Sequence, residues 1–342
     1  MATKTSKNLT LADWAKRQDP SGKTAKIVEL LAETNEILED MVYVEANSDL
    51  GHRVSQRTGL PAVAYRKMNQ GVPSGKSKVA EITESMAMLE GIMEVDKDEA
   101  DLGGKTKEFL ESESVAFSEA MNQKSAETMF YGSATNAAEY VGFTERYNDL
   151  GAKNGQNILD AGGTGSNNCS VWLLGMSKST VCGIFPKGSM AGLEMNNLGE
   201  DWATDDDGNK FRAYQSQWKN KSGICVKDWR FAVRIANINV SDLRSQTGTQ
   251  APDADTALIK LMTRAKARLP RTAGVKLSYY APRVVSEMLQ VAALDKSNST
   301  LSVEDAINQF GDDVQKLKFL KTPIGTVDQL LENESRVIDQ ST

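Results

Sequence analysis

The sequence is poor in the side chains on which most enzyme and metal chemistry depends. Its 342 residues include one histidine, His52, and three well-separated cysteines, Cys169, Cys182 and Cys225. Zinc sites, Cys–His dyads and disulfide frameworks need more of these residues or a closer spacing. We therefore expect no metal, cofactor or disulfide, and we interpret the cysteines as reduced, buried small hydrophobes.

Long apolar runs are also lacking. No stretch approaches the ~18 apolar residues of a membrane span, and no apolar run follows the basic N-terminal start, so we expect neither a span nor a secretion signal. The net charge of 40 − 46 = −6 gives no general attraction to nucleic acid or anionic membranes. At ~150 residues per domain the length suggests about two domains, and 40% hydrophobic residues are enough to form their cores.

Opposite charges are sorted into neighbouring segments. Residues 51–80 carry six basic residues and no acid, whereas residues 81–119 carry twelve acidic residues and three lysines. The basic residues are Arg53, Arg57, Arg66, Lys67, Lys76 and Lys78. Runs of like charge usually lie on solvent-exposed surfaces without a specific partner. The alternative is that the basic segment of one copy lies on the acidic segment of another, facing residues such as Glu108, Glu111 and Glu113.

Several elements follow from local patterns in the first part of the chain. Helices are expected over Leu11–Gln18 and from about Lys23 to Asp40. Short alternating stretches over 51–95 predict a projecting hairpin whose two arms of about 15 residues would each reach about 50 Å. Residues 106–131 contain no glycine or proline and predict a long helix that Gly132 ends.

The second part of the chain alternates between strand and helix patterns. Strands are expected over 170–176, 180–185 and 211–218, and a half-buried strand over 229–238. From about residue 252 a helix over 255–269, a strand over 275–280 and a helix over 283–294 predict a compact α/β domain. A short capped helix is expected over 303–310, followed by strands over 317–320 and 325–330.

Four features resemble functional motifs, and each has a simpler interpretation. Gly71–Ser77 has three residues between its glycines where a phosphate-binding P-loop has four, so a hairpin tip is favoured. Asp205–Asn209 lacks the outer ligands of a calcium loop and predicts an acidic turn, and Gly162–Ser166 predicts a flexible loop. No pairing of His52 with a Ser, Cys or Asp is suggested by the sequence around it, which favours a structural or interfacial role.

The order of these parts resembles the major capsid protein of tailed bacteriophages, which has the Hong Kong 97-type fold. Short strings similar to the coat proteins of short-tailed phages occur at Ile27–Met41, Gly51–Arg53, Arg57–Pro61, Asn69–Val72, Glu94–Asp98, Asn157–Gly165 and Gly183–Gly188. They are distributed over most of the chain and have no catalytic meaning.

The resemblance implies an α+β fold with an N-terminal arm (1–50), an extended hairpin loop or E-loop (51–95), a peripheral domain (96–251) with a spine helix at about 106–131, and an axial domain (252–342). It implies a structural protein, without enzyme activity, that assembles into pentamers and hexamers of an icosahedral head around double-stranded DNA. Expected partners are further copies of the chain, scaffold, portal and decoration proteins, and packaged DNA through non-specific contact. The expected location is the virion, assembled in the bacterial cytoplasm.

Two other classes remain open at this point. One is an α/β nucleotide-binding protein or enzyme that uses the Gly71–Ser77 loop. The other is a different virion component, such as a cement or tail protein.

Overall fold

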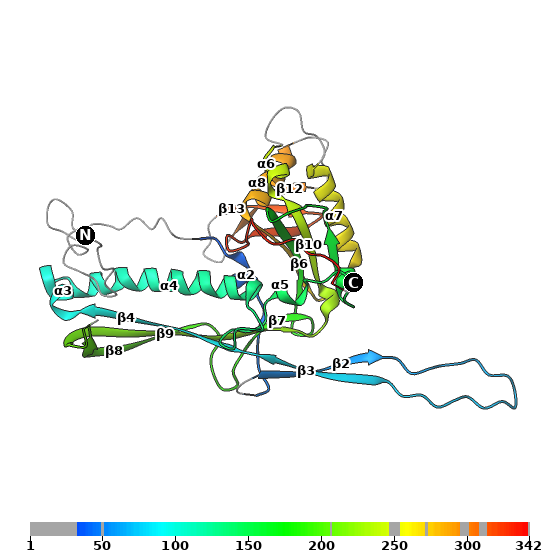
Figure 1. Cartoon of the computed structure of the whole chain (residues 1–342), viewed down its shortest axis with the longest axis horizontal. Helices are drawn as coiled ribbons and strands as arrows, with labels where there is room; N and C mark the ends of the chain where they lie inside the picture. Colours follow the sequence, from blue (N-terminus) through cyan, green and yellow to red (C-terminus); the bar gives the residue numbers. More distant parts are fainter. Residues whose placement is uncertain are drawn as a thin grey trace. The chain divides into compact units, whose positions relative to one another are not determined.

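The computed structural model describes residues 33–48, 51–205, 207–245, 254–270, 273–294, 301–307 and 313–340. The chain divides into two compact units. Figure 1 shows and labels their helices and strands. Of the described residues, unit 1 takes 33–34, 88–125 and 192–221, and unit 2 takes the remainder. In the described ranges no helix is long and apolar enough to cross a membrane.

Unit 2 contains most of the regular structure. Its strands are β1 (Tyr43–Glu45), β2 (Gly51–Gly59), β3 (Lys78–Ser85), β5 (Ile158–Asp160), β6 (Asn168–Met176), β7 (Val181–Phe185), β10 (Ala232–Asn239), β11 (Lys276–Ala281), β12 (Leu301–Ile307), β13 (Asp313–Phe319) and β14 (Thr322–Thr326). Its helices are α2 (Glu36–Asp40), α5 (Phe143–Arg146), α6 (Val240–Ser245), α7 (Ala254–Arg268) and α8 (Arg283–Leu294), with short 3-10 turns η2 (Gly155–Asn157) and η3 (Trp229–Phe231).

Unit 1 is smaller. It contains most of β4 (Ala87–Asp96), and all of α3 (Lys97–Asp101), η1 (Leu102–Gly104) and β8 (Leu193–Thr204). The long helix α4 (Thr106–Tyr131) and the long strand β9 (Lys210–Val226) contribute residues to both units.

β6 is the central strand of the sheet in unit 2. It runs antiparallel to β10 on one side and to β11 on the other, so that Leu174 faces Ala232 and Ser278. The sheet continues from β11 through β14 and β13 to β12, and from β6 through β7 to the end of β9. β5 pairs in parallel with β10, and β1 pairs in parallel with β7.

Both faces of this sheet are buried, and the sequence of β6 shows why. Successive side chains of a strand point to opposite faces. Val171 and Leu173 pack with residues of α7 and α8, whereas Trp172 and Leu174 pack on the other face with Phe130 from the end of α4 and with residues of α2 and α5. A strand covered on both sides needs a continuous apolar run, which β6 has from Val171 to Met176.

In unit 1, α4 packs on one face of a small sheet. β4 and β8 flank β9 in that sheet. Phe109 and Phe117 of α4 contact a cluster that includes Met93 and Val95 of β4 and Tyr214 of β9. The apolar stripe of the helix is narrow, as its sequence predicts, because only one side of the helix meets the sheet.

The end of α4 is set by a glycine. The N–H of Gly132 donates to the carbonyl oxygen of Thr128 at 2.8 Å. A Cβ atom at residue 132 would collide with the carbonyl oxygens of Tyr140 and Thr128. The expected helix over 106–131 is therefore present with the expected end.

Two expected helices are wrong in the described part. Residues 33–34 are not helical and Asn35 forms an isolated bridge with Val327, so only Glu36–Asp40 of the helix expected over 23–40 is helical among the described residues. The helix over Leu11–Gln18 lies outside the described residues. The short helix expected at 303–310 is instead strand β12, because its backbone pairs in register with β13 from Leu301 to Ile307.

Two strand expectations also need correction. The hairpin pairs only over β2 and β3, and residues 87–96 form β4 beside β9 rather than the rest of a 15-residue arm. The strand expected to be half-buried over 229–238 begins at Ala232 and is buried on both faces, because Arg234 on its polar-looking face is enclosed in the core.

Candidate assembly surface

The hairpin of β2 and β3 is paired at its root and open at its outer end. Antiparallel pairing runs from Gly51–Ser85 to Gly59–Lys78, with an irregularity between Arg57 and Gly59. Residues 60–77 continue beyond the ladder without strand pairing and end in a turn where Gln70 N–H donates to the carbonyl oxygen of Lys67. Asn69 there adopts a positive φ of 62°, which asparagine tolerates.

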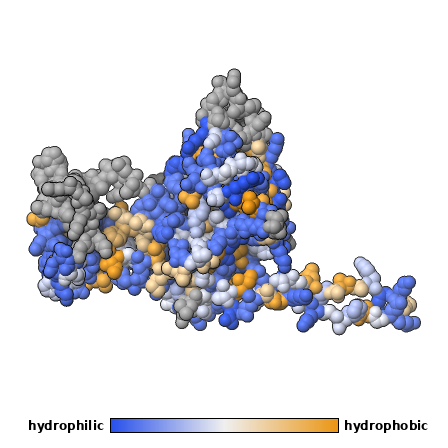
Figure 2. Space-filling model, viewed as in Figure 1, coloured by the Kyte–Doolittle hydropathy of each residue, from blue (hydrophilic) through white to orange (hydrophobic). Residues whose placement is uncertain are grey.

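The outer end exposes large apolar side chains. Tyr65 and Met68 have relative exposures of 110% and 94%, and Leu60 and Val63 are exposed to 83% and 89%. Figure 2 shows apolar residues interspersed with hydrophilic ones along this hairpin. Scattered apolar residues are normal on protein surfaces, but several together on residues 60–77, which have no partner strand and pack on none of the core clusters of the described residues, indicate an interaction surface.

The six basic residues singled out in the sequence all lie on this hairpin. Arg53 is already paired across the strands with Glu81 at 2.9 Å, and Arg66 donates to the carbonyl oxygen of Gln70 at 3.3 Å. The others, Arg57, Lys67, Lys76 and Lys78, are exposed and make no ion pair within the described part of the chain. The open positive charge therefore lies mainly toward the outer end.

The root of the hairpin is fixed by polar contacts to the rest of unit 2. Arg146 of α5 donates to both carboxylate oxygens of Glu84 at 2.7 Å, and both side chains are largely buried. The side-chain amide of Gln56 donates to the carbonyl oxygens of Val226 and Lys227 at 3.1 and 2.9 Å. The sequence carries no signal for these contacts, since their partners lie 62 to 171 residues apart.

His52 is buried at the same root. Its Nδ1 accepts the backbone N–H of Asn47 at 3.3 Å, and it faces Glu84 across the strands. Burial, and then the positive charge of Lys227, lower the pKa of His52, while Glu84 acts in the opposite direction. This neutral imidazole accepts a backbone hydrogen bond, in agreement with the structural role expected from the sequence.

The three glutamates expected to face the hairpin of another copy lie on α4 in unit 1. Glu108 pairs with Lys105 at 2.7 Å and Glu111 with Lys107 at 3.7 Å, both on the surface of the helix. Glu113, two residues after Glu111 and about half a turn round the helix, is partly buried. The helix thus screens part of its own negative charge, and the contact with another copy stays a prediction.

The remaining motif-like segments hold no binding geometry. Gly71–Ser77 is extended and exposed rather than wrapped. The carboxylate of Asp205 accepts the backbone N–H groups of Asp207 and Asn209, which closes a turn between β8 and β9 and lowers the pKa of Asp205. In the described ranges, no group of three or more His, Cys, Asp or Glu residues is placed to hold a metal ion.

The glycine loop at 162–165 is also closed to a phosphate. The N–H of Gly162 donates to the carboxylate of Asp160, and that of Gly163 donates to the carbonyl oxygen of Asn237, both at 2.8 Å. A pocket of about 210 Å³ adjoins the loop, but Asp242 contributes to its lining. Two occupied N–H groups and an acidic neighbour disfavour an anion here.

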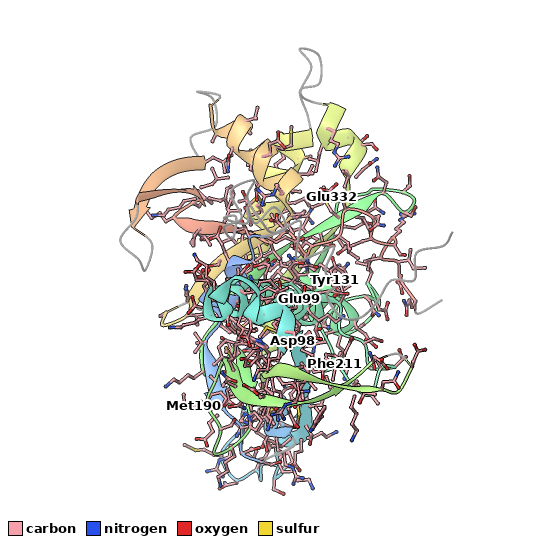
Figure 3. The ribbon with its side chains drawn as sticks, turned by 90° about the vertical axis from the view of Figure 1, so that its left-hand side faces the viewer. Asp98, Glu99, Tyr131, Met190, Phe211 and Glu332 are labelled. Atoms are coloured by element: carbon pink, nitrogen blue, oxygen red, sulfur yellow. The ribbon has the colours of Figure 1, made fainter. Side chains whose placement is uncertain are left out.

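The structure contains one buried charged cluster that the sequence does not predict. Arg234 of β10 donates to Glu334 at 2.9 Å, to the hydroxyl of Ser170 at 3.0 Å and to the carbonyl oxygen of Tyr147 at 2.7 Å. The hydroxyl of Tyr131, labelled in Figure 3, donates to the other oxygen of Glu334 at 2.6 Å, and burial, with Glu334, raises the pKa of Tyr131. Each charge in the cluster has a partner inside the protein, so the cluster has a structural role.

A family model described as major capsid protein GP7 matches residues 19–338 of this chain. A solved chain from bacteriophage epsilon15 is similar over 99% of this chain and 99% of its own length, with 29% identity and a TM-score of 0.77. A capsid chain of bacteriophage JBD30 covers 91% of this chain and 99% of its own length, with 8% identity and a TM-score of 0.49. No curated protein matches the chain.

Proposed function

The chain belongs to the major capsid protein GP7 family, and from that premise we propose that its basic, apolar hairpin is the limb by which one copy binds the next. The protein has the Hong Kong 97-type capsid fold and is a structural, non-enzymatic component of an icosahedral phage head. Family membership decides against the nucleotide-binding enzyme and against a cement or tail protein.

The exposed apolar side chains of residues 60–77 are the observation that carries the proposal. Burying a side chain such as Met68 stabilises by roughly 1.5–3 kcal/mol, and within its own unit Met68 stays almost fully exposed. A contact between copies gains this energy, and a non-reciprocal contact repeated by rotation closes into rings. Pentamers and hexamers are such rings, and we propose that this protein forms them.

We propose the acidic surface of α4 in a neighbouring copy as the partner of the basic hairpin. The residues are Arg53, Arg57, Arg66, Lys67, Lys76 and Lys78 on the hairpin, and Glu108, Glu111 and Glu113 on the helix. Because exposed ion pairs contribute ~0–1 kcal/mol each, they would set register and orientation, while the apolar side chains supply most of the affinity.

The apolar contribution is tested by assembly of purified protein, followed by electron microscopy and sedimentation. Tyr65→Ser with Met68→Ser should leave the circular dichroism and melting temperature of the unassembled chain unchanged, since both side chains are exposed there, and should reduce shell yield at least tenfold. Tyr65→Phe with Met68→Leu keeps the apolar area and should assemble normally. Normal shell yield from the serine variant would refute the proposal.

The electrostatic partner is tested by charge reversal. Arg57→Glu with Arg66→Glu should reduce shell yield without unfolding the subunit. Adding Glu108→Lys and Glu111→Lys in the same chain should restore yield if hairpin and helix face each other between copies. Reduced yield without rescue would keep the hairpin as the limb but place its partner elsewhere.

Further partners follow from the expected place of the protein in a head. We propose that it contacts scaffold, portal and decoration proteins, that it meets packaged double-stranded DNA without sequence specificity, and that it assembles in the bacterial cytoplasm. The net charge of −6 supports weak DNA contact, because a strongly basic inner surface would hold the DNA tightly. The weak contact with DNA is tested by measuring how DNA fragments bind to the unassembled chain at different salt concentrations. Tight binding at 150 mM salt would contradict it.

A further inference from the structure

Two cysteines face each other across neighbouring strands near the root of the hairpin. Cys182 of β7 and Cys225 of β9 are directly opposed in the antiparallel register, and both are free and fully buried. We propose that they form a reversible cross-strand disulfide when the protein meets a low-molecular-weight disulfide as oxidant.

The register of β7 and β9 brings the two backbones to a suitable distance. Lys227 N–H donates to the carbonyl oxygen of Thr180, its opposite residue, at 2.8 Å, which makes this a hydrogen-bonded pair. Opposed pairs alternate along an antiparallel ladder, so the cysteine pair two steps further is of the same kind, with Cα atoms about 5.5 Å apart. Natural disulfides most often join Cα atoms about 5.5–6 Å apart.

Closing the bond draws the strands slightly together. Directly opposed Cβ atoms lie about 4.5–5.5 Å apart in a ladder, and a hydrogen-bonded pair such as this one lies at the long end of that range, whereas a disulfide holds its Cβ atoms about 3.5–4.5 Å apart. Bonds formed under such tension are the ones that small thiols reduce most readily. The bond is therefore expected to open again under mild reduction.

The surroundings limit access to the sulfur atoms and activate one of them. The pair forms a small cluster with Ile184, covered by the half-buried Val54 of β2 and Met86 next to β3. Val44 of β1 also packs against this cluster, so an oxidant reaches the sulfurs only when these covering side chains move. The hydrogen bond with Cys225 outweighs the opposing effect of burial and, with the charge of Lys227, lowers the pKa of Cys182, which favours Cys182 as the attacking thiol.

The chemistry balances with one molecule of oxidant. The thiolate of Cys182 attacks one sulfur of the small disulfide and releases one small thiol, leaving a mixed disulfide. Cys225 then loses its proton, attacks the sulfur of Cys182 and displaces the second small thiol. Two protein thiols are oxidised, and one small disulfide is reduced to two thiols.

The virion location implies that the cysteine pair meets two different redox environments. Cytosol keeps thiols reduced, whereas particles outside cells meet oxidising conditions. A bond between β7 and β9 would then restrain the strands beside the hairpin root after release. The inference depends on the virion location of the protein and not on the proposed hairpin contact, so either can fail without the other.

The experiment uses purified full-length chain and assembled shells treated with 2-hydroxyethyl disulfide. Alkylation after denaturation should count three thiols before treatment and one afterwards, with dithiothreitol restoring all three. Peptide mapping should link Cys182 to Cys225, and intact mass should fall by two hydrogen atoms. Cys169→Ala is the matched control and should go from two thiols to none, whereas Cys225→Ala should form no internal link.

The treated wild-type protein should melt at a higher temperature than the reduced protein, and this shift should be absent in Cys225→Ala. Three results would overturn the proposal. They are three thiols persisting in folded protein under conditions that oxidise the unfolded chain, a lasting mixed disulfide on Cys182 of the wild type, or a link through Cys169.

Discussion

Replacing Glu334 by glutamine should destabilise the fold far more than the same replacement two residues earlier, at Glu332. The two oxygens of Glu334 accept from three donors, the buried Ser170 and Arg234 and the partly buried Tyr131. Glutamine offers one oxygen and a donor group in place of the second oxygen. At least one donor then loses its partner, and the buried guanidinium loses its counter-charge.

The magnitude follows from burial. The side chains of Arg234 and Glu334 are exposed to only 2% and 5%, and removing one partner of such a pair costs about 3–5 kcal/mol. The control pair, Arg244 and Glu332, is as close, at 2.6 Å, but its side chains are exposed to 63% and 39%. Exposed pairs contribute about 0–1 kcal/mol, so E332Q should lose no more than that.

Urea unfolding followed by tryptophan fluorescence measures the difference. Trp172 lies under the guanidinium of Arg234 at 5.3 Å and reports on this part of the core. A loss of 3 kcal/mol, with a slope of about 3 kcal/mol per molar, moves the urea midpoint of E334Q down by about 1 M. Equal urea midpoints for E334Q and for the control E332Q, whose position is labelled in Figure 3, would refute the reasoning that burial decides the effect.

Two further predictions concern single residues. Because burial, and then the charge of Lys227, lower the pKa of His52 below its ordinary 6.5, the folded chain binds this proton less readily than the unfolded chain. Stability that is full above pH 6.5 is therefore lost as the pH falls toward the folded value. Melting temperatures at pH 7.5 and 5.5 should show this loss in the wild type and not in H52Q, and equal slopes would contradict it. Gly132→Ala should cost about 1–3 kcal/mol in urea unfolding because its Cβ meets the carbonyl oxygen of Tyr140. Gly71→Ala, in open space, should change stability by less than about 0.5 kcal/mol, and similar losses at both sites would disprove the steric account.

Elements specified by local sequence were predictable. The helix over 106–131 was predictable because the local sequence marks its end with Gly132, and so was α8, which begins directly after Pro282. β12 was mistaken for a helix because its state depends on pairing with β13, which a local pattern does not contain. Local sequence therefore predicts the elements that are determined by backbone preferences and by neighbouring residues in the chain.

The polar contacts that fix the structure were not predictable for the same reason. The alternating pattern of residues 229–238 places Arg234 on a solvent-exposed face. In the structure Arg234 is buried, and its counter-charge is Glu334, 100 residues away in sequence. Glu84 looked like part of an acidic surface, yet it is buried against Arg146, 62 residues away. In both cases the sequence shows the charge but not its partner, so the charge was assigned to solvent.

The contrast between the two ends of the hairpin supports the assembly role more strongly than either end alone. At the root, Glu84 and Gln56 make contacts in the body of unit 2 that hold the direction of the limb. At the tip, residues 60–77 lack a ladder and expose Tyr65 and Met68. A limb that served only stability would be buried along its length, and a disordered linker would need no buried anchor. A fixed root with an unpaired, apolar tip is the arrangement that the proposed contact between copies requires.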